Sequence, residues 1–470
     1  MGRKEHIQTL LGRTYARMLP NHEHVAAYNR AMNTLTALRA GTLTGTRHLR
    51  LNCGLDAFPR EILDLADTLE ILDLSGNALS DLPEDFDRLH RLRIVFLSAN
   101  AFTHVPPVLG RCSSLTMLGM KANAIEHVDG SALAPGLRWL ILTDNRITAL
   151  PDQIGHCPNM QKLMLAGNRL TTLPESLAIC RNLELLRLSA NRLQTLPDWL
   201  FTLPRLAWLA IAGNPLDTPA KPPATTAASW ADIELQEQLG EGASGVIYRA
   251  TWTERQEDVA VKLFKGSVTS DGLPESEVHA CMTAGVHAHL IGAHARIDDH
   301  PDGLDGLIMP LVDPTLRNLA GPPSFESCTR DVYAPEQHLS IHTASRIAAG
   351  IARAACHLHA AHLMHGDLYG HNILYAQDGH ALLGDFGAAS FYAQTTPPQA
   401  CERIEARAFG LLLQELLTLA SHDKASAPHL FDALATLAMQ CVTPDVSERP
   451  AFAEIVQNID AALRLLDGKA

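Results

Sequence analysis

Apolar and polar positions follow a fixed period through the first half of the chain. Each repeat unit has the form Leu-x2-Leu-x-Leu-x2-Asn, as in residues 183–191, with other apolar residues replacing some of the Leu. The closing residue recurs every 22 or 23 positions, as Asn77, Asn100, Asn123, Asn145, Asn168, Asn191 and Asn214. One such unit cannot bury its own apolar face, so we expect consecutive units to stack as a solenoid.

Each unit is predicted to form one short strand whose spaced Leu side chains point into the solenoid core. The Asn side chains are expected to bond backbone groups that the turns leave unpaired, forming a ladder. The residues between the core positions then face the concave surface in two columns. The columns comprise Asp73, Phe96, Gly119, Ile141, Met164, Arg187 and Ala210, and Ile71, Ile94, Met117, Trp139, Lys162, Leu185 and Trp208.

These two columns are unusually apolar for a solvated sheet face. A contiguous apolar patch usually marks a binding surface. The alternative is that the face packs on the chain's own second domain or on the N-terminal segment. We expect a protein partner on the concave face, at Phe96, Trp139, Ile141, Met164, Arg187 and Trp208.

The segments that flank the repeats differ from them in composition. The repeats span residues 48–216, and residues 1–47 are predicted to form a partly disordered, helical cap over the open apolar end. Residues 217–231 are rich in Pro, Ala and Thr, which predicts a short, semi-stiff linker. A further domain is expected from residue 232 to residue 470.

A glycine-rich turn between β-type segments opens this last domain. The run Gly240-x-Gly242-x-x-Gly245 is followed by a strand-like segment, and Lys262 ends the next strand-like run, residues 258–262. Glycine lets a backbone approach phosphate groups closely, and a Lys on the neighbouring strand can hold them. A Gly-x-Gly-x-x-Gly run alone is weak evidence, but this order of elements indicates a nucleotide site.

Three polar side chains further along have the spacing of a metal–nucleotide site. Asn372 follows Asp367 by five residues, and Asp385 of an Asp-Phe-Gly triplet comes thirteen residues later. One carboxylate can accept the proton of an attacking hydroxyl group, while the amide and the other carboxylate hold Mg²⁺ against the nucleotide. The pattern therefore predicts phosphoryl transfer.

Taken together, these motifs resemble the eukaryotic-type protein kinase family over about residues 232–467, and the repeats resemble leucine-rich repeats of the 23-residue kind. The chain is thus similar to a soluble, bacterial-like leucine-rich-repeat protein kinase. The resemblance implies a multidomain fold. An α/β leucine-rich-repeat solenoid would be followed by an α+β bilobal protein-kinase-like domain.

The resemblance also implies roles for individual residues. Asp367 would be the catalytic base, Lys262 would hold the α- and β-phosphates of ATP, and Glu277 would pair with that Lys. Asn372 and Asp385 would bind Mg²⁺. The nucleotide-binding set would comprise Gly240, Glu241, Gly242, Ala243, Ser244, Gly245, Ile247, Ala260, Lys262, the gatekeeper Met309 and the hinge residue Leu311.

The sequence departs from the family pattern around the predicted site. Gly366 stands where most members carry Arg, Tyr369 stands where serine/threonine kinases carry Lys, and Glu405 replaces an Asp. The interval after the Asp-Phe-Gly triplet is short and lacks the Ala-Pro-Glu motif of the peptide-binding platform. Arg449 matches an Arg that pairs with that motif in the family. Because the motif is absent, we expect Arg449 to pair with Glu402 instead.

Composition narrows the function further. The net charge of −13 disfavours a general nucleic-acid role, no run is long and apolar enough to span a membrane, and no secretory signal is evident. Nine Cys without a Cys-x-x-Cys pair indicate a reducing, cytoplasmic setting.

We therefore predict an ATP- and Mg²⁺-dependent protein kinase of the serine/threonine rather than the tyrosine type. It would act on a protein substrate in signal transduction, and its repeats would recognise a partner or regulate the kinase. Two alternatives stay open. One is a small-molecule phosphotransferase similar to aminoglycoside or choline kinases, and the other is a nucleotide-binding pseudokinase scaffold.

Overall fold

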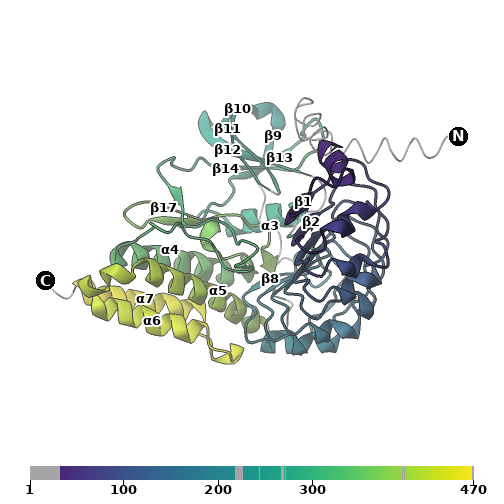
Figure 1. The fold of residues 1–470 in the computed structure, drawn as a ribbon. Coiled ribbons are helices and arrows are strands. Elements are labelled where there is room, and N and C mark those ends of the chain that lie inside the picture. Colours follow the sequence, from purple (N-terminus) through teal and green to yellow (C-terminus); the bar gives the residue numbers. More distant parts are fainter. Residues whose placement is uncertain are drawn as a thin grey trace. The chain divides into compact units, whose positions relative to one another are not determined.

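The chain divides into two compact units whose boundary lies between Leu137 and Arg138. Figure 1 shows the labelled helices and strands of the chain, coloured along the sequence. The computed structural model describes residues 32–217, 226–242, 244–265, 269, 271–393, 395 and 397–467. Most of the predicted N-terminal cap, residues 1–31, lies outside the described residues, and residues 32–39 form a helix. No described helix is both long enough and apolar enough to cross a membrane.

The first unit contains four short parallel strands, one from each repeat. Each strand pairs in register with the next, so that Ile71 lies opposite Ile94 and Ile94 opposite Met117. The strands are β1 (His48–Arg50), β2 (Ile71–Asp73), β3 (Ile94–Phe96) and β4 (Met117–Gly119), and the 3-10 helices are η1 (Arg60–Leu65), η2 (Phe86–Arg88), η3 (Pro107–Arg111) and η4 (Gly130–Ala132).

The second unit begins with four more repeats built in the same way. In-register pairing sets Trp139 opposite Lys162, and Met164 opposite Arg187, which confirms the two predicted columns in this unit. The strands are β5 (Trp139–Ile141), β6 (Lys162–Met164), β7 (Leu185–Arg187) and β8 (Trp208–Ala210), and the 3-10 helices are η5 (Asp152–His156), η6 (Glu175–Ile179) and η7 (Asp198–Thr202).

The regular spacing of Asn along the chain produces the predicted ladder. Asn191 accepts a hydrogen bond from Leu170 N at 3.0 Å and donates to the carbonyls of Leu165 and Leu188, both at 2.9 Å. Its neighbours along the coil, Asn168 and Asn214, bond the adjacent turns in the same way. Each amide therefore satisfies backbone groups of two repeats, which a strand of three residues could not satisfy alone.

A six-stranded sheet and one helix follow the repeats. The strand order is β10-β11-β12-β14-β13-β9. Strand β12 pairs with β11 on one edge and with β14 on the other, so Lys262 lies opposite both Ile247 and Leu307. The elements are β9 (Ala227–Ser229), η8 (Trp230–Asp232), β10 (Ile233–Glu241), β11 (Gly245–Trp252), β12 (Glu257–Phe264), α3 (Pro274–Ala284), β13 (Ala295–Asp298) and β14 (Gly306–Pro310).

The predicted linker, residues 217–231, differs from the expectation at its C-terminal end. Residues 218–225 lie outside the described residues. Residues 227–229 form β9, which pairs in parallel with β13 and places Ala228 opposite Ile297. The apolar Ala pair can enter the sheet because it carries no bulk or charge, so the end of the predicted linker is a strand.

The last part of the chain is mainly helical. Helix α4 begins at the N-cap Ser340, whose hydroxyl accepts from Thr343 N. The helices are α4 (Ile341–Ala360), α5 (Pro398–Leu419), α6 (Pro428–Cys441) and α7 (Phe452–Asp467), with η9 (Gly370–Asn372), η10 (Ser421–Ser426) and η11 (Val446–Glu448). Two small sheets contain β15 (Arg317–Asn318), β17 (Ile373–Tyr375) and β18 (Ala381–Leu383), and β16 (Leu363–Met364) and β19 (Ser390–Phe391).

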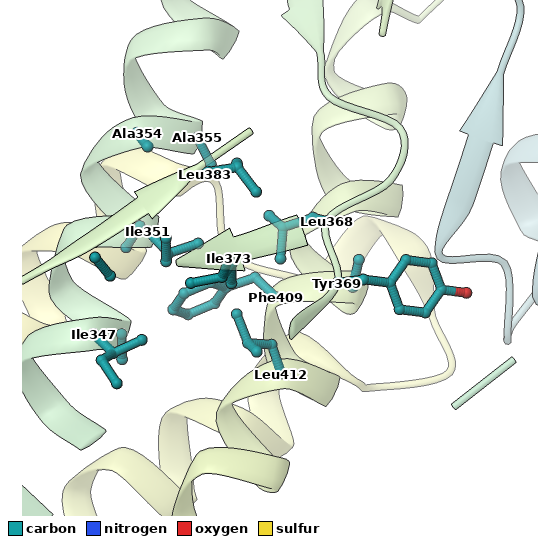
Figure 2. Packing of buried hydrophobic residues seen from close by; sticks show 14 of the residues in the cluster. Ile347, Ile351, Ala354, Ala355, Leu368, Tyr369, Ile373, Leu383, Phe409 and Leu412 are labelled. Atoms are coloured by element: carbon teal, nitrogen blue, oxygen red, sulfur yellow. The ribbon is translucent and has the colours of Figure 1, made fainter. Parts of the chain in front are cut away.

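One apolar core joins these helices to the repeats of the second unit. Ile351 of α4 and Phe409 of α5 pack together with Leu368, which lies between β16 and η9 (Figure 2). The same cluster contains Leu185 of β7 and Trp208 of β8. The concave face of these repeats is therefore packed against the chain's own C-terminal part.

This packing corrects the expectation of a separate protein partner at part of the concave face. Met164, Arg187 and Trp208 are buried within the second unit, and Trp139 and Ile141 pack against the same cluster. These five residues instead follow the alternative expectation, because they pack on the C-terminal part of the same chain. Phe96 lies in the first unit and is half-buried.

Candidate active site

A cavity of about 210 Å³ lies beneath the glycine-rich turn between β10 and β11. The turn is closed by a hydrogen bond from Gly242 N to the carbonyl of Gly245 at 2.9 Å. A Cβ at Gly245 would lie 2.5 Å from the carbonyl oxygen of Leu263, so the close approach of β11 and β12 requires glycine there. Eight predicted residues line the cavity: Gly242, Ser244, Gly245, Ile247, Lys262, Glu277, Met309 and Asp385.

The other predicted nucleotide-binding residues lie around this cavity without lining it. Gly240 and Glu241 are the last residues of β10, and Ala260 is buried on β12 opposite Met309. Leu311 lines a different hollow of about 420 Å³. Ala243 lies outside the described residues.

Lys262 and Glu277 form a buried ion pair on one wall of the cavity. Burial alone would lower the pKa of Lys262, but the charges of Glu277 and Asp385 outweigh it and raise that pKa. Burial raises the pKa of Glu277 to about 7, against the opposing effect of Lys262. Oε2 of Glu277 is buried without a hydrogen-bond partner among the described residues, so this wall can accept a further donor or cation.

Asp367 is held by its neighbours in the loop between β16 and η9. The side-chain amide of Asn372 donates to the carbonyl oxygen of Asp367 at 2.9 Å and to its Oδ2 at 3.0 Å. The buried carboxylate of Glu405, on α5, accepts from the backbone N–H groups of His365 at 3.1 Å and Gly366 at 2.6 Å. Glu405 therefore anchors the loop that carries Asp367.

The structure gives a physical reason for the unusual Gly366. Its φ is +74°, a conformation that side chains other than glycine rarely adopt. A Cβ would also lie 2.6 Å from the carbonyl oxygen of Ala388 and 2.7 Å from that of Leu209, in the last repeat. The close approach of the repeats to this loop excludes the larger side chain that the resemblance implied.

The predicted metal ligands, Asn372 and Asp385, are brought together by a backbone hydrogen bond. Gly384 N donates to the carbonyl of Asn372 at 3.0 Å, and Asp385 follows with its carboxylate exposed at the cavity. The Asn372 amide nitrogen is engaged by Asp367, which leaves its Oδ1 for a cation.

This donor set fits Mg²⁺ bound together with phosphate groups. Mg²⁺ prefers oxygen ligands and is usually held by one or two protein carboxylates plus substrate phosphates. Across the described ranges, no group of three or more His, Cys, Asp or Glu side chains could hold a metal on its own.

Two charged residues at the site, Arg187 and Asp271, were not predicted to belong to it. Arg187, at the end of β7, forms ion pairs with Asp367 and with Asp271, which lies in the segment between β12 and α3. Its Nη1 also donates to the carbonyl of Gly366 at 2.9 Å. The available signal was a single Arg within the concave column, because a buried Arg requires hydrogen-bond acceptors or carboxylates around its guanidinium group.

Tyr369 is also explained by the repeats. Its ring stacks on that of Trp208, with 4.2 Å between the ring centroids and an interplanar angle of 7°. Trp208 Nε1 donates to the carbonyl of Leu368 at 3.1 Å. Figure 2 shows the Tyr369 ring pointing away from the other labelled residues, whereas Leu368 lies among them.

The expected pairing of Arg449 with Glu402 is wrong. Arg449 donates to the carbonyls of Thr443 at 3.0 Å and of Pro204, in the last repeat, at 2.9 Å. Glu402 instead accepts from the backbone N–H of Phe452. The fully buried Arg449 reaches carbonyl oxygens of the repeat because the last repeat packs beside it.

Comparison with known families assigns both parts of the chain. Residues 233–410 match the family model of the protein kinase domain. Residues 135–193 and 158–216 match one leucine-rich-repeat model, and residues 68–89 match another. These matches follow the two sequence patterns, the 23-residue repeat and the series of motifs from Gly240 to Asp385.

Curated relatives match between about a third and a half of the chain. Fibroblast growth factor receptor 1 of Xenopus laevis is 26% identical over 286 residues, which cover 49% of this chain and 35% of the receptor. Mitogen-activated protein kinase kinase kinase 11 of Rattus norvegicus is 27% identical over 295 residues, covering 51% and 32%. The Cyclin-dependent kinase 4 homolog of Caenorhabditis elegans is 28% identical over 172 residues, covering 34% and 39%. The chain therefore spans between about a third and two fifths of the length of these relatives.

Proposed function

Because the chain carries a protein kinase domain together with leucine-rich repeats, we propose that it transfers the γ-phosphoryl group of Mg-ATP to a hydroxyl group of a protein. The acceptor would be Ser or Thr rather than Tyr. The observation that carries the proposal is the buried Lys262–Glu277 pair facing the same cavity as Asp385. This arrangement aligns the phosphate-holding and metal-holding groups without further movement of α3.

The nucleotide would lie under the glycine-rich turn. The backbone of the turn at Gly242 and Ser244 would cover the phosphates, while Ile247 and Met309 would enclose the base from β11 and β14. Lys262, held in place by Glu277, binds the α- and β-phosphates. Asn372 and Asp385 would hold Mg²⁺, which would supply positive charge to offset the charge of the phosphates.

Asp367 performs the acid–base part of the reaction. Its carboxylate orients the acceptor hydroxyl and takes its proton as the hydroxyl oxygen bonds to the γ-phosphorus. The bond from that phosphorus to the bridging oxygen of ATP breaks, and ADP leaves with this oxygen. The amide of Asn372 fixes Oδ2, so the carboxylate does not rotate freely. Glu405 fixes the backbone of the same loop through two N–H groups.

A small-molecule acceptor is the second candidate, and one observation favours it. Arg187 pairs with Asp367, and Trp208 of the repeats bonds the next residue, Leu368, so side chains of the repeats lie against Asp367. An acceptor that reaches Asp367 past these side chains has to be narrow, such as an extended peptide terminus, a loop or a small alcohol.

The experiment uses the full chain with radiolabelled γ-phosphate ATP and Mg²⁺. Transfer is measured to the chain itself, to casein and myelin basic protein, and to aminoglycosides, with Asp367→Asn as the matched control. We expect label on Ser or Thr of protein, and none with the variant. Label on an aminoglycoside alone would contradict the protein acceptor. Equal label with wild type and variant would contradict the enzymatic proposal in favour of a nucleotide-binding scaffold.

We further propose that the protein acts in the cytoplasm in signal transduction, with its repeats contributing to protein recognition. All nine cysteines are present as thiols, and eight of them are buried, which suits a reducing compartment. We propose that the repeats of the first unit contribute to this recognition.

A further inference from the structure

Arg187 is a buried cation in the middle of the candidate active site. Its side chain is 2% exposed and uses three different nitrogens. Nε donates to Oδ1 of Asp271 at 2.7 Å, Nη1 donates to the carbonyl of Gly366 at 2.9 Å, and Nη2 donates to Oδ1 of Asp367. The planar guanidinium therefore connects the repeat, the segment before α3 and the loop that carries Asp367.

The charge of Arg187 is balanced by these two carboxylates. Burial alone would lower the pKa of Arg187, but Asp367 and Asp271 outweigh it and raise the pKa, so the side chain is charged at every working pH. Without this cation, Asp271 and Asp367 would face each other as like charges. Lys162 interacts electrostatically with Arg187 and with both carboxylates. Its Nζ lies over the ring of Trp139, 4.1 Å from the ring centroid.

The contacts that flank Arg187 make its position a fixed part of the unit. In the next repeat, Trp208 stacks on Tyr369 and donates a hydrogen bond to the carbonyl of Leu368. In the same repeat, the backbone N–H groups of Ile211 at 2.9 Å and Ala212 at 3.1 Å donate to the hydroxyl of Ser390. These groups are buried, so moving the repeat away would expose a Trp and leave several polar groups unpaired.

Asp367 is consequently held from two directions. Arg187 binds Oδ1, and the amide of Asn372 binds Oδ2. A carboxylate fixed at both oxygens presents a defined lone pair to an incoming hydroxyl group, whereas one fixed only at Oδ2 can rotate about the Cβ–Cγ bond. The repeat thus supplies half of the support for the residue that performs the acid–base step.

We propose that Arg187 is a positioning residue for phosphoryl transfer, so that the seventh repeat is a working part of the active site. This inference rests on the proposed function, because it assigns Arg187 to the reaction that Asp367 performs. Arg187 acts through Asp367 and Asp271. Arg187 itself and Asp367 do not line the nucleotide cavity, whereas Asp271 does. Loss of Arg187 should therefore affect turnover more than ATP binding.

The test compares Arg187→Ala and Arg187→Lys with wild type in the full chain. Arg192→Ala is the matched control, because Arg192 is an exposed Arg of the same repeat and its loss changes net charge equally. Steady-state kcat and the KM for ATP are measured with Mg-ATP and myelin basic protein, and also for ATP hydrolysis by water. Fluorescent-nucleotide binding and thermal unfolding of each variant measure the folded fraction.

We expect Arg187→Ala to lower kcat about 100-fold, the usual effect of misplacing a catalytic group by about 1 Å, with the KM for ATP within about twofold of wild type. Arg187→Lys keeps the charge but loses the three-point fork, so it should restore about a tenth of the wild-type kcat. Arg192→Ala should match wild type. If Arg187→Ala fails to fold, the Lys variant decides, because it leaves no unpaired buried charge.

Three outcomes would overturn the inference. An unchanged kcat in the folded Lys variant would mean that Arg187 only supports the fold. A raised kcat in either variant would mean that Arg187 inhibits Asp367. If the kcat of wild type is no higher than that of Asp367→Asn, the proposed function itself is refuted, and the inference with it. If wild type is active and the Arg187 variants have the same kcat, the inference alone is refuted.

Discussion

Replacing Trp208 by Ala should strongly destabilise the second unit. Trp208 is 2% exposed, stacks on Tyr369 and donates a hydrogen bond to the carbonyl of Leu368. Truncating a buried Trp to Ala usually costs about 3–5 kcal/mol. The Leu368 carbonyl, left without its donor in a buried place, adds about 1 kcal/mol or more. We therefore expect a loss of about 4–6 kcal/mol in the free energy of unfolding.

Two further variants separate the components of this loss. Trp208→Phe keeps an aromatic ring against Tyr369 but removes the N–H group, so it should cost about 1–2 kcal/mol. Trp199→Ala is the matched control, because Trp199 is a half-buried Trp of the neighbouring η7. Its truncation should cost about 1–2 kcal/mol, since only part of the ring area leaves water on folding.

The assay is urea unfolding followed by far-ultraviolet circular dichroism, with kcat measured on the same preparations. Trp208→Ala should lower the urea midpoint more than either comparison variant and should also lower kcat, because Leu368 and Tyr369 follow Asp367 directly. A Trp208→Ala variant that loses less than about 1 kcal/mol, or no more than Trp199→Ala, would refute the view that the repeat and the catalytic loop share one core.

Two other predictions concern the buried charges. Glu277→Gln should lower kcat/KM for ATP about 100-fold, because Lys262 loses the partner that positions it, and a fluorescent-nucleotide titration should show weaker binding; undiminished binding would contradict the phosphate-holding role of Lys262. The pKa of His371 is raised, because Asp331 outweighs the opposing effect of burial. Its contribution to stability should be complete below about pH 6.5 and decline as pH rises through the raised pKa. The difference in unfolding free energy between wild type and His371→Gln should therefore shrink from pH 6 to pH 9, and a constant or growing difference would exclude this linkage.

The sequence was sufficient wherever a function depends on local periodicity or on elements close together in the chain. The repeat of Asn fixed both the strand positions and the columns, and the register that places Met164 opposite Arg187 follows from it. Lys262 and Glu277 are fifteen residues apart, on consecutive elements, and they pair as the resemblance implied. In both cases the partner lies within a few tens of residues, so few arrangements compete.

The sequence was insufficient where the partner is distant in the chain. Arg187 and Asp367 are 180 residues apart. An apolar column containing one Arg indicates burial, but it does not say which carboxylates balance the charge or which surface covers the column. The same applies to Arg449, whose partners are carbonyl oxygens of the last repeat, a group that carries no sequence signature.

The sequence alone predicted a solenoid of short strands, a glycine-rich turn for a nucleotide and Asn372 beside Asp367, because spacing and residue type specify local geometry. Only the tertiary structure decided that the concave face of the second unit is filled by the catalytic loop. That packing explains why residue 366 must be Gly, with the Leu209 carbonyl beside it, and why Tyr369 faces Trp208. The reason is physical: complementarity between two surfaces depends on their shapes and charges once folded, and neither surface exists in the linear chain.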